Sequence, residues 1–201
     1  TDPAGERHDA IWYRMGDKTY PLSHNRIRHI YEDKEQQLWI ATDGSINRYD
    51  YATRQFIHYN IVDNTGTYNT NWTYYIFEDT AGQLWISTCL GGIFVVDKHK
   101  LMQSTSGQYI AEQNYSVHNG LSGMFINQII PDNEGNVWVL LYNNKGIDKI
   151  NPRTREVTKL FADELTGEKS PNYLLCDEDG LLWVGFHGGV MRINPKDESQ
   201  Q

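Results

Sequence analysis

The stretch DEDGLLWVGFHGGVMRIN occupies residues 177–194, and three earlier stretches of the chain repeat its pattern. The other copies are DKEQQLWIATDGSINRYD at 33–50, DTAGQLWISTCLGGIFVVD at 79–97 and DNEGNVWVLLYNNKGIDKIN at 132–151. In each copy an aspartate stands six positions before a tryptophan, and these repeat positions are Asp33, Trp39, Asp79, Trp85, Asp132, Trp138, Asp177 and Trp183. Because the copies recur at intervals of about 45–53 residues, the pattern indicates a β-propeller, in which each blade holds four strands.

The first copy and its flanking residues indicate how one blade is built. Four short runs rich in β-branched and aromatic residues, at 27–31, 38–42, 46–50 and 55–60, are separated by clusters of polar residues and glycine. This alternation is typical of an antiparallel meander. The second run is apolar at nearly every position, as expected for a strand that is covered on both faces. We therefore predict an all-β fold made of four-stranded antiparallel blades.

The conserved spacing within each copy predicts a turn between the first two strands of a blade. The aspartate can accept hydrogen bonds from backbone N–H groups two residues on, and a glycine three residues later supplies a positive φ. Three copies have this glycine, whereas the first copy has Gln36. The tryptophan is predicted to fill the wedge between adjacent sheets, where burying the ring removes roughly 150–250 Å² from water.

The sequence predicts a single propeller segment across residues 1–201. The blades are expected at about 22–60, 68–117, 121–161 and 170–195. Residues 10–15 resemble a fourth, outermost strand, whereas the last copy ends after its third strand. About four blades are therefore expected. Two arrangements remain open, because the N-terminal strand could complete the last blade and close a small ring, or the chain could be an arc of a larger propeller.

The charge and hydropathy of the chain exclude several classes of partner. The sequence has 18 basic and 26 acidic side chains, a net charge of −8. A surface of that sign repels phosphate and anionic lipid, so we expect no nucleic acid and no direct membrane insertion. The opening TDPAGERHDA lacks the apolar core of a signal peptide, which is expected of a cytosolic protein or of a piece of a longer one.

No residue pattern indicates a cofactor, a metal or a catalytic centre. No two of the seven histidines have zinc-ligand spacing with a third partner. The DEDG turn at 177–180 lacks the other ligands of a calcium loop, so it is interpreted as a repeat turn. Cys89 and Cys176 form no CxxC pair, and we predict buried thiols rather than a disulfide. The chain is therefore predicted to be non-catalytic, with no cofactor and no metal.

The aromatic residues that remain after the repeat tryptophans indicate a ligand site. Trp72 lies in TYNTNWTYY at 67–75, the linker that leads into the inner strand of the second blade. Such linkers lie on one rim of a propeller, where aromatic faces can stack on sugar rings and polar side chains can bond the hydroxyls. The candidate ligand-binding residues are Tyr68, Asn69, Asn71 and Trp72, with His24, Asn25 and Arg28 from the blade before. The alternative, which stays open, is that these rings pack between blades or against a partner domain.

The combined pattern of the copies resembles the two-component regulator propeller repeat. DEDGLLWVGFHGGVMRINP at 177–195 matches most closely, and PLSHNRIRHIYED at 21–33 and NGLSGMFINQII at 119–130 resemble the inter-blade linker of that family. The first copy departs from the pattern because it lacks the turn glycine. The third copy has LLYNNKG where the family has a GT-GG segment. The resemblance covers roughly residues 12–195.

The resemblance implies that the chain is part of a periplasmic sensor region of a membrane-anchored hybrid two-component sensor histidine kinase of the Bacteroidetes type. In that family the region typically holds two seven-bladed propellers, so this chain would be a fragment of one of them. The implied ligand is an oligosaccharide, and the implied partners are other propeller and sensor domains of the parent chain. A homodimer is a further expectation, since an incomplete ring must cover its open blade faces.

Two other functions remain open. The chain could be a protein–protein interaction propeller that binds a polypeptide rather than a sugar. It could also be a propeller lyase, which would need a general base on the central rim, such as His24 or His187.

Overall fold

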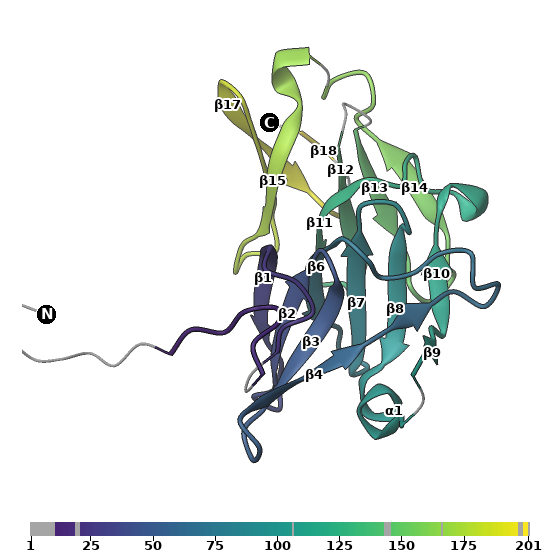
Figure 1. Cartoon of the computed structure of the whole chain (residues 1–201). Helices are drawn as coiled ribbons and strands as arrows, with labels where there is room; N and C mark the ends of the chain where they lie inside the picture. The colour runs from purple at the N-terminus through teal and green to yellow at the C-terminus, as the bar shows by residue number, and fades with distance from the viewer. Residues whose placement is uncertain are drawn as a thin grey trace, which may run out of the picture.

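The computed structural model of the chain describes residues 11–18, 21–105, 107–142, 146–165, 167–196 and 199–200. Four four-stranded antiparallel sheets follow one another along the chain, and each sheet is one blade (Figure 1). The first blade holds β1 (Ile27–Glu32), β2 (Leu38–Thr42), β3 (Ser45–Asp50) and β4 (Gln55–Tyr59). The second holds β6 (Thr73–Glu78), β7 (Gln83–Thr88), β8 (Ile93–Asp97) and β10 (Gln113–Tyr115). The third holds β11 (Ile126–Pro131), β12 (Val137–Leu141), β13 (Ile147–Ile150) and β14 (Val157–Leu160). The fourth holds β15 (Pro171–Cys176), β16 (Leu182–Phe186), β17 (Gly189–Asn194) and β18 (Ser199–Gln200). The all-β propeller fold predicted from the repeats is thus confirmed.

The second blade carries elements that the other described blades lack. After β8 the chain forms the helix α1 (Lys98–Gln103), whose N-cap Asp97 accepts a hydrogen bond from the backbone N–H of Lys100. The short strand β9 (Tyr109–Ile110) then pairs in parallel with β5 (Ile61–Val62) from the linker before the blade. Two single-turn 3₁₀ helices occur in later linkers, η1 (Val117–Asn119) and η2 (Gly167–Lys169). The inserted helix and strand explain why the second repeat is longer than the others.

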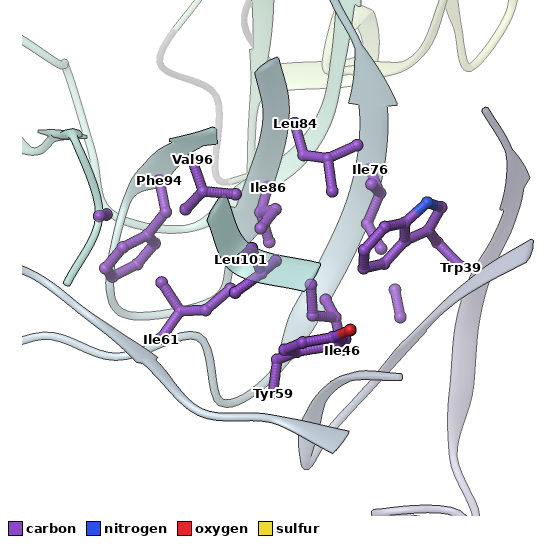
Figure 2. Packing of buried hydrophobic residues seen from close by; sticks show 12 residues of the cluster. Trp39, Ile46, Tyr59, Ile61, Ile76, Leu84, Ile86, Phe94, Val96 and Leu101 are labelled. Carbon is purple, nitrogen blue, oxygen red and sulfur yellow. The ribbon is translucent and has the colours of Figure 1, made fainter. Parts of the chain in front are cut away.

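Three apolar clusters lie between successive sheets and hold them together. The cluster between the first and second blades contains Trp39, Tyr59 and Leu101, and Figure 2 shows Leu101 of α1 packed among side chains of both sheets. The second cluster contains Trp85 and the third contains Trp138. These three tryptophans are buried, as predicted for rings that fill the wedge between adjacent sheets. Trp183 of the last blade is only half-buried, since its sheet has a neighbour on one face.

Each repeat aspartate makes two kinds of hydrogen bond, of which the sequence analysis predicted one. Oδ1 of Asp132 accepts from the backbone N–H groups of Glu134 and Asn136, both at 2.9 Å, as expected for the turn. Oδ2 of Asp132 accepts from Nε1 of Trp138 at 2.9 Å. The other three aspartate–tryptophan pairs make the same bond, at 2.6–2.9 Å. This hydrogen bond fixes the tryptophan ring to the turn, and we call it the aspartate–tryptophan clamp.

The turn residue Gln36 offers a test of this local geometry. Gln36 has φ 62°, close to the φ of 78–84° at the equivalent Gly82, Gly135 and Gly180. A non-glycine residue in the left-handed region lowers the free energy of unfolding by roughly 1 kcal/mol. Glycine avoids this strain, but it loses more chain entropy on folding, which offsets part of the gain. We therefore expect Gln36→Gly to raise the free energy of unfolding by up to about 1 kcal/mol. Urea denaturation measures this change in the free energy of unfolding. A clear loss of stability in the variant would contradict the left-handed conformation of Gln36.

The ends of the chain differ from the expectation. Residue 10 of the expected strand 10–15 lies outside the described residues, and residues 11–15 form no strand but only a bridge from Arg14 to Pro21. Tyr13 packs instead on Tyr49 and Phe56 of the first blade. The last blade does not end after its third strand, because Ser199–Gln200 pairs with β17 as a short fourth strand. The polar pair of residues in β18 has no apolar alternation from which a strand could be predicted.

The ring formed by the described residues is open, as expected for a fragment of a propeller. The inner strands β1, β6, β11 and β15 contact one another in series. The outer face of the last sheet exposes apolar side chains, namely Tyr173, Leu175 and Val190. The closed small ring is therefore not the arrangement of this chain. Both cysteines are free thiols; Cys89 is buried and Cys176 is half-buried.

Candidate functional site

Four of the predicted ligand-binding residues line one hollow at the rim. Tyr68, Asn69, Asn71 and Trp72 form it together with Thr67, Leu90 and Gly91, and its volume is about 350 Å³. The first five belong to the linker that precedes β6, and the last two belong to the turn between β7 and β8. We call this cavity the rim hollow. Tyr68, Asn69, Asn71 and Trp72 were predicted from the sequence, whereas Thr67 and the two turn residues were not.

Local hydrogen bonds explain why the linker holds this shape. The carboxylate of Asp63 accepts from the backbone N–H of Tyr68 at 2.7 Å, and Oδ1 of Asn69 accepts from the N–H of Asn71 at 3.0 Å. Asx turns of this kind satisfy backbone donors without a strand partner. Thr73 closes the linker by donating its hydroxyl to the carbonyl of Thr70 at 2.6 Å. The residues that line the rim hollow are thus preorganised by the chain itself.

Trp72 is the most unusual residue of the rim hollow. Its side chain is exposed (46%), whereas the tryptophans Trp39, Trp85 and Trp138 are buried. Its backbone has φ 56°, in the left-handed region that a bulky residue rarely adopts. Two interactions hold that conformation: its N–H donates to the carbonyl of Asp43 at 3.1 Å, and its carbonyl accepts from the N–H of Cys89 at 2.9 Å. Backbone strain maintained by surrounding structure is concentrated at functional sites.

The residues predicted from the preceding blade do not line the rim hollow. Nε of Arg28 donates to Oδ1 of Asp43 at 2.7 Å, and its guanidinium lies 4.4 Å from the ring centroid of Tyr74. Burial acts to raise the pKa of the Asp43 carboxyl, but the hydrogen bond and charge of Arg28 outweigh it and hold that pKa below its usual value. Since the carbonyl of Asp43 binds Trp72, Arg28 supports the rim hollow indirectly.

His24 and Asn25 are engaged elsewhere in the first blade. Nδ1 of His24 accepts from the backbone N–H of Arg26 at 3.0 Å. Oδ1 of Asn25 accepts from the N–H of Met15 at 2.7 Å. Neither residue lines the rim hollow. All three residues were predicted as one group from the segment 24–28, in which His24 and Asn25 precede β1 and Arg28 lies within it.

A second, smaller hollow lies beside the rim hollow. It is lined by Tyr74, Cys89, Phe125, Ile126, Asn127 and Tyr142, and its volume is about 190 Å³. Phe125 and Tyr142 are exposed. Burial raises the pKa of the Cys89 thiol, so this thiol stays protonated and acts as an apolar group. Aromatic rings therefore line the rim on both sides of the turn that contains Cys89 and Leu90.

Among the described residues the structure contains no group of three or more His, Cys, Asp or Glu side chains that could hold a metal ion. His24 and His187 belong to the first and last blades, and His187 is exposed. In the described part of the chain, no helix has the length and apolar character of a membrane span.

The comparison with known families agrees with the repeat geometry. The family described as "Two component regulator propeller" matches residues 21–44, which contain β1 and β2. The chain carries the two component regulator propeller repeat. The same turn, aspartate–tryptophan clamp and four-stranded sheet recur in all four blades, so the repeat extends beyond the matched residues. No curated protein matches the chain.

Two solved structures from B. thetaiotaomicron are similar to this repeat segment. The extracellular domain of the candidate one component system BT4673 is 96% identical over the whole chain, with a TM-score of 0.93. The extracellular domain of the candidate hybrid two component system BT3049 is 20% identical over 94% of the chain, with a TM-score of 0.70. The chain spans only 27% and 26% of these two proteins, respectively. The repeat segment thus has the fold of the extracellular domains of such signalling proteins.

A lyase has the same architecture with little sequence similarity. Virginiamycin B lyase from Staphylococcus aureus is 16% identical to the chain, with a TM-score of 0.67 over 90% of the chain and 57% of the lyase. At this identity the likeness shows the propeller fold alone.

Proposed function

We propose that this chain is a non-catalytic segment of the periplasmic sensor region of a membrane-anchored two-component regulator, and that its rim hollow binds a carbohydrate. The extracellular signalling part of the proposal is supported by the 96% identity to part of the extracellular domain of the candidate one component system BT4673. The two-component part is supported by the family match over residues 21–44. The ligand class rests on the chemistry of the rim hollow itself.

The observation that carries the proposal is the composition of the rim hollow. The exposed ring of Trp72 and the half-buried ring of Tyr68 provide faces on which sugar rings can stack. Asn69 and Asn71 are exposed beside them, and their amides can donate to and accept from hydroxyl groups. Among the described residues, none of those that line the rim hollow is charged, which suits a neutral polyhydroxylated ligand.

A ligand in the rim hollow would act on the packing between blades. The backbone of Trp72 is bonded to Asp43 of the first blade and to Cys89 of the second. We infer that a ligand that shifts the backbone of Trp72 would act on both sheets. We propose that the exposed apolar face of the last blade, with Tyr173, Leu175 and Val190, packs against another domain of the parent chain or against a second copy.

The ligand proposal predicts a selective effect of Trp72→Ala. A thermal-shift screen against oligosaccharides should reveal one class that stabilises the chain, by about 2.7 kcal/mol at 100 times the dissociation constant. Trp72→Ala should weaken that binding roughly 30-fold, since a central aromatic contact contributes about 2 kcal/mol. Trp12→Ala is the matched control, because Trp12 is also exposed but does not line the rim hollow. Equal binding by both variants would contradict the assignment of the site.

The protein-interaction alternative has one supporting observation, the exposed apolar face of the last blade. A stable polypeptide partner in the absence of any sugar response would favour it. The lyase alternative has no comparable support, since the likeness to virginiamycin B lyase shows the fold alone.

A further inference from the structure

A larger polar cavity shares two of its lining residues with the rim hollow. This cavity has a volume of about 580 Å³, and Thr67 and Tyr68 line both it and the rim hollow. Its other walls come from residues 63–65 of the same linker, from the segment 111–119 and from Arg155 in the turn between β13 and β14. We call it the outer hollow. The ring of Tyr68 lies at the boundary of the two cavities.

The outer hollow is formed by the parts of the chain that depart from the repeat. The linker 60–72 is longer than the corresponding linkers 116–125 and 161–170. The parallel pair of β5 and β9 joins this linker to the inserted segment after β8. Insertions that alter only one blade of a repeat protein are typical of binding surfaces rather than of the core.

The acidic residues of the outer hollow are already bonded within the protein. The carboxylate of Asp63 accepts from the N–H of Tyr68 and from the hydroxyl of Thr65. Burial acts to raise the pKa of Asp63, but the hydrogen bonds from Thr65 and Tyr68 hold it below its usual value. Glu112 accepts from the hydroxyl of Tyr109 at 2.8 Å and from the N–H of Asp97 at 2.9 Å. Neither carboxylate is therefore available as the main contact for a ligand.

Three polar side chains of the outer hollow have no such partner. In the described part of the chain, Asn64, Gln113 and Arg155 make no side-chain hydrogen bond or ion pair, and Gln113 is half-buried. Two amides and a guanidinium provide several N–H donors and two carbonyl acceptors. His118 lies beside them, and its Nε2 is 3.2 Å from the hydroxyl of Tyr68. These groups can bond the hydroxyl or carboxylate oxygens of a sugar.

We propose that the outer hollow is a second sugar subsite, and that the ligand is an oligosaccharide extending from Trp72 across the ring of Tyr68 to Gln113 and Arg155. This inference rests on the proposed function, because it extends the ligand of the rim hollow. A monosaccharide would fill only one of the two cavities. The affinity should therefore increase with the number of sugar units until both cavities are occupied.

The test is a comparison of ligand lengths by isothermal titration calorimetry. The probes are β-1,4-linked gluco-, xylo-, manno- and galacto-oligosaccharides, together with α-1,4-linked oligogalacturonates, each with one to six units. For the class that binds, we expect the dissociation constant to fall with length. The double variant Gln113→Ala/Arg155→Ala should lose about tenfold in affinity for long probes and retain the affinity for short ones. Trp72→Ala should weaken the binding of all lengths. A loss larger for oligogalacturonates than for neutral probes would show that Arg155 contacts a carboxylate.

The chain offers a matched control for this double variant. Arg54 lies in the equivalent turn of the first blade, with φ 58° against 63° for Arg155, and Gln55 follows it. Gln55 begins β4 as Gln113 begins β10. Arg54→Ala/Gln55→Ala should therefore reproduce any effect of the substitutions on such a turn and on the start of an outer strand, without an effect on sugar binding.

The outcomes separate the two proposals. Binding that depends on Trp72 but not on length, with unchanged side-chain amide NMR signals of Asn64 and Gln113, would overturn the second subsite and leave the rim site intact. A length effect that persists in the double variant would also overturn it. Failure of every probe to bind would overturn the proposed function and the second subsite together.

Discussion

Replacing Lys98 with methionine is expected to lower the free energy of unfolding by about 3–5 kcal/mol, because it leaves buried carboxylates without their cation. The side chain of Lys98 is fully buried. Nζ lies 2.8 Å from Oε1 of Glu78 and 3.2 Å from Oδ2 of Asp33, and both carboxylates are buried. Burial acts to lower the pKa of Lys98, but the hydrogen bonds that Lys98 donates to Glu78 and Asp33 hold it above its usual value. Methionine is unbranched like lysine and only one heavy atom shorter, so it fills most of the same space while it removes the charge and its donors.

The control for Lys98 is Lys100→Met. The side chain of Lys100 is 66% exposed, and it lies 3.5 Å from Asp97 and 3.7 Å from Glu112. Exposed pairs of this kind contribute about 0–1 kcal/mol, so this variant should remain close to the native stability. Urea denaturation at pH 7 and pH 5 measures both variants. The deficit of Lys98→Met should shrink at pH 5, because the unpaired carboxyls can then take up protons. An equal deficit at both values would contradict a charge-based origin.

The second large effect is expected at the repeat tryptophans, and it should depend on their position in the array. Trp138 is fully buried between the third and fourth blades, so Trp138→Ala should cost about 3–5 kcal/mol. Trp183 makes the same bond to its aspartate, but its ring is half-exposed. Trp183→Ala should therefore cost less, roughly 1–2 kcal/mol.

Urea denaturation of both alanine variants provides the comparison. Both substitutions remove the same indole hydrogen bond. The difference between their losses in free energy of unfolding therefore reports how tightly one sheet packs on the next. Equal losses at Trp138 and Trp183 would contradict the view that the outer face of the last sheet is uncovered in this chain.

The fold could be predicted from the sequence because the same signal occurs four times. A single Asp-Trp spacing has little meaning, but four copies at similar intervals define the blade and place its turn. The bond from the indole of Trp39 to Asp33 was not predicted, since a spacing of six residues in a turn does not reveal which oxygen faces the ring. The buried cation at Lys98 was also missed, because it belongs to an inserted helix with no counterpart in the repeat.

The candidate site could be predicted in part. The linker 67–72 was placed on the rim because it joins an outer strand of one blade to the inner strand of the next, and its residues do line one cavity. The outer hollow could not be predicted. It depends on β5 and β9, two strands of two residues each that lie far apart in the sequence and carry no periodicity. Gln113 and Arg155 are brought to Tyr68 only by that pairing and by the packing of the third blade.

In the described part of this chain, the extensive contacts between sheets all join neighbours, so the molecule is a linear stack with a middle and two ends. The second and third sheets are supported from both sides, whereas the first and fourth are supported from one. Local opening in such an array begins at the ends, where fewer contacts must break, and backbone amides exchange with solvent soonest there. The linker that carries Trp72 and Tyr68 enters the second sheet, and it is therefore anchored in the slowest-exchanging part of the stack.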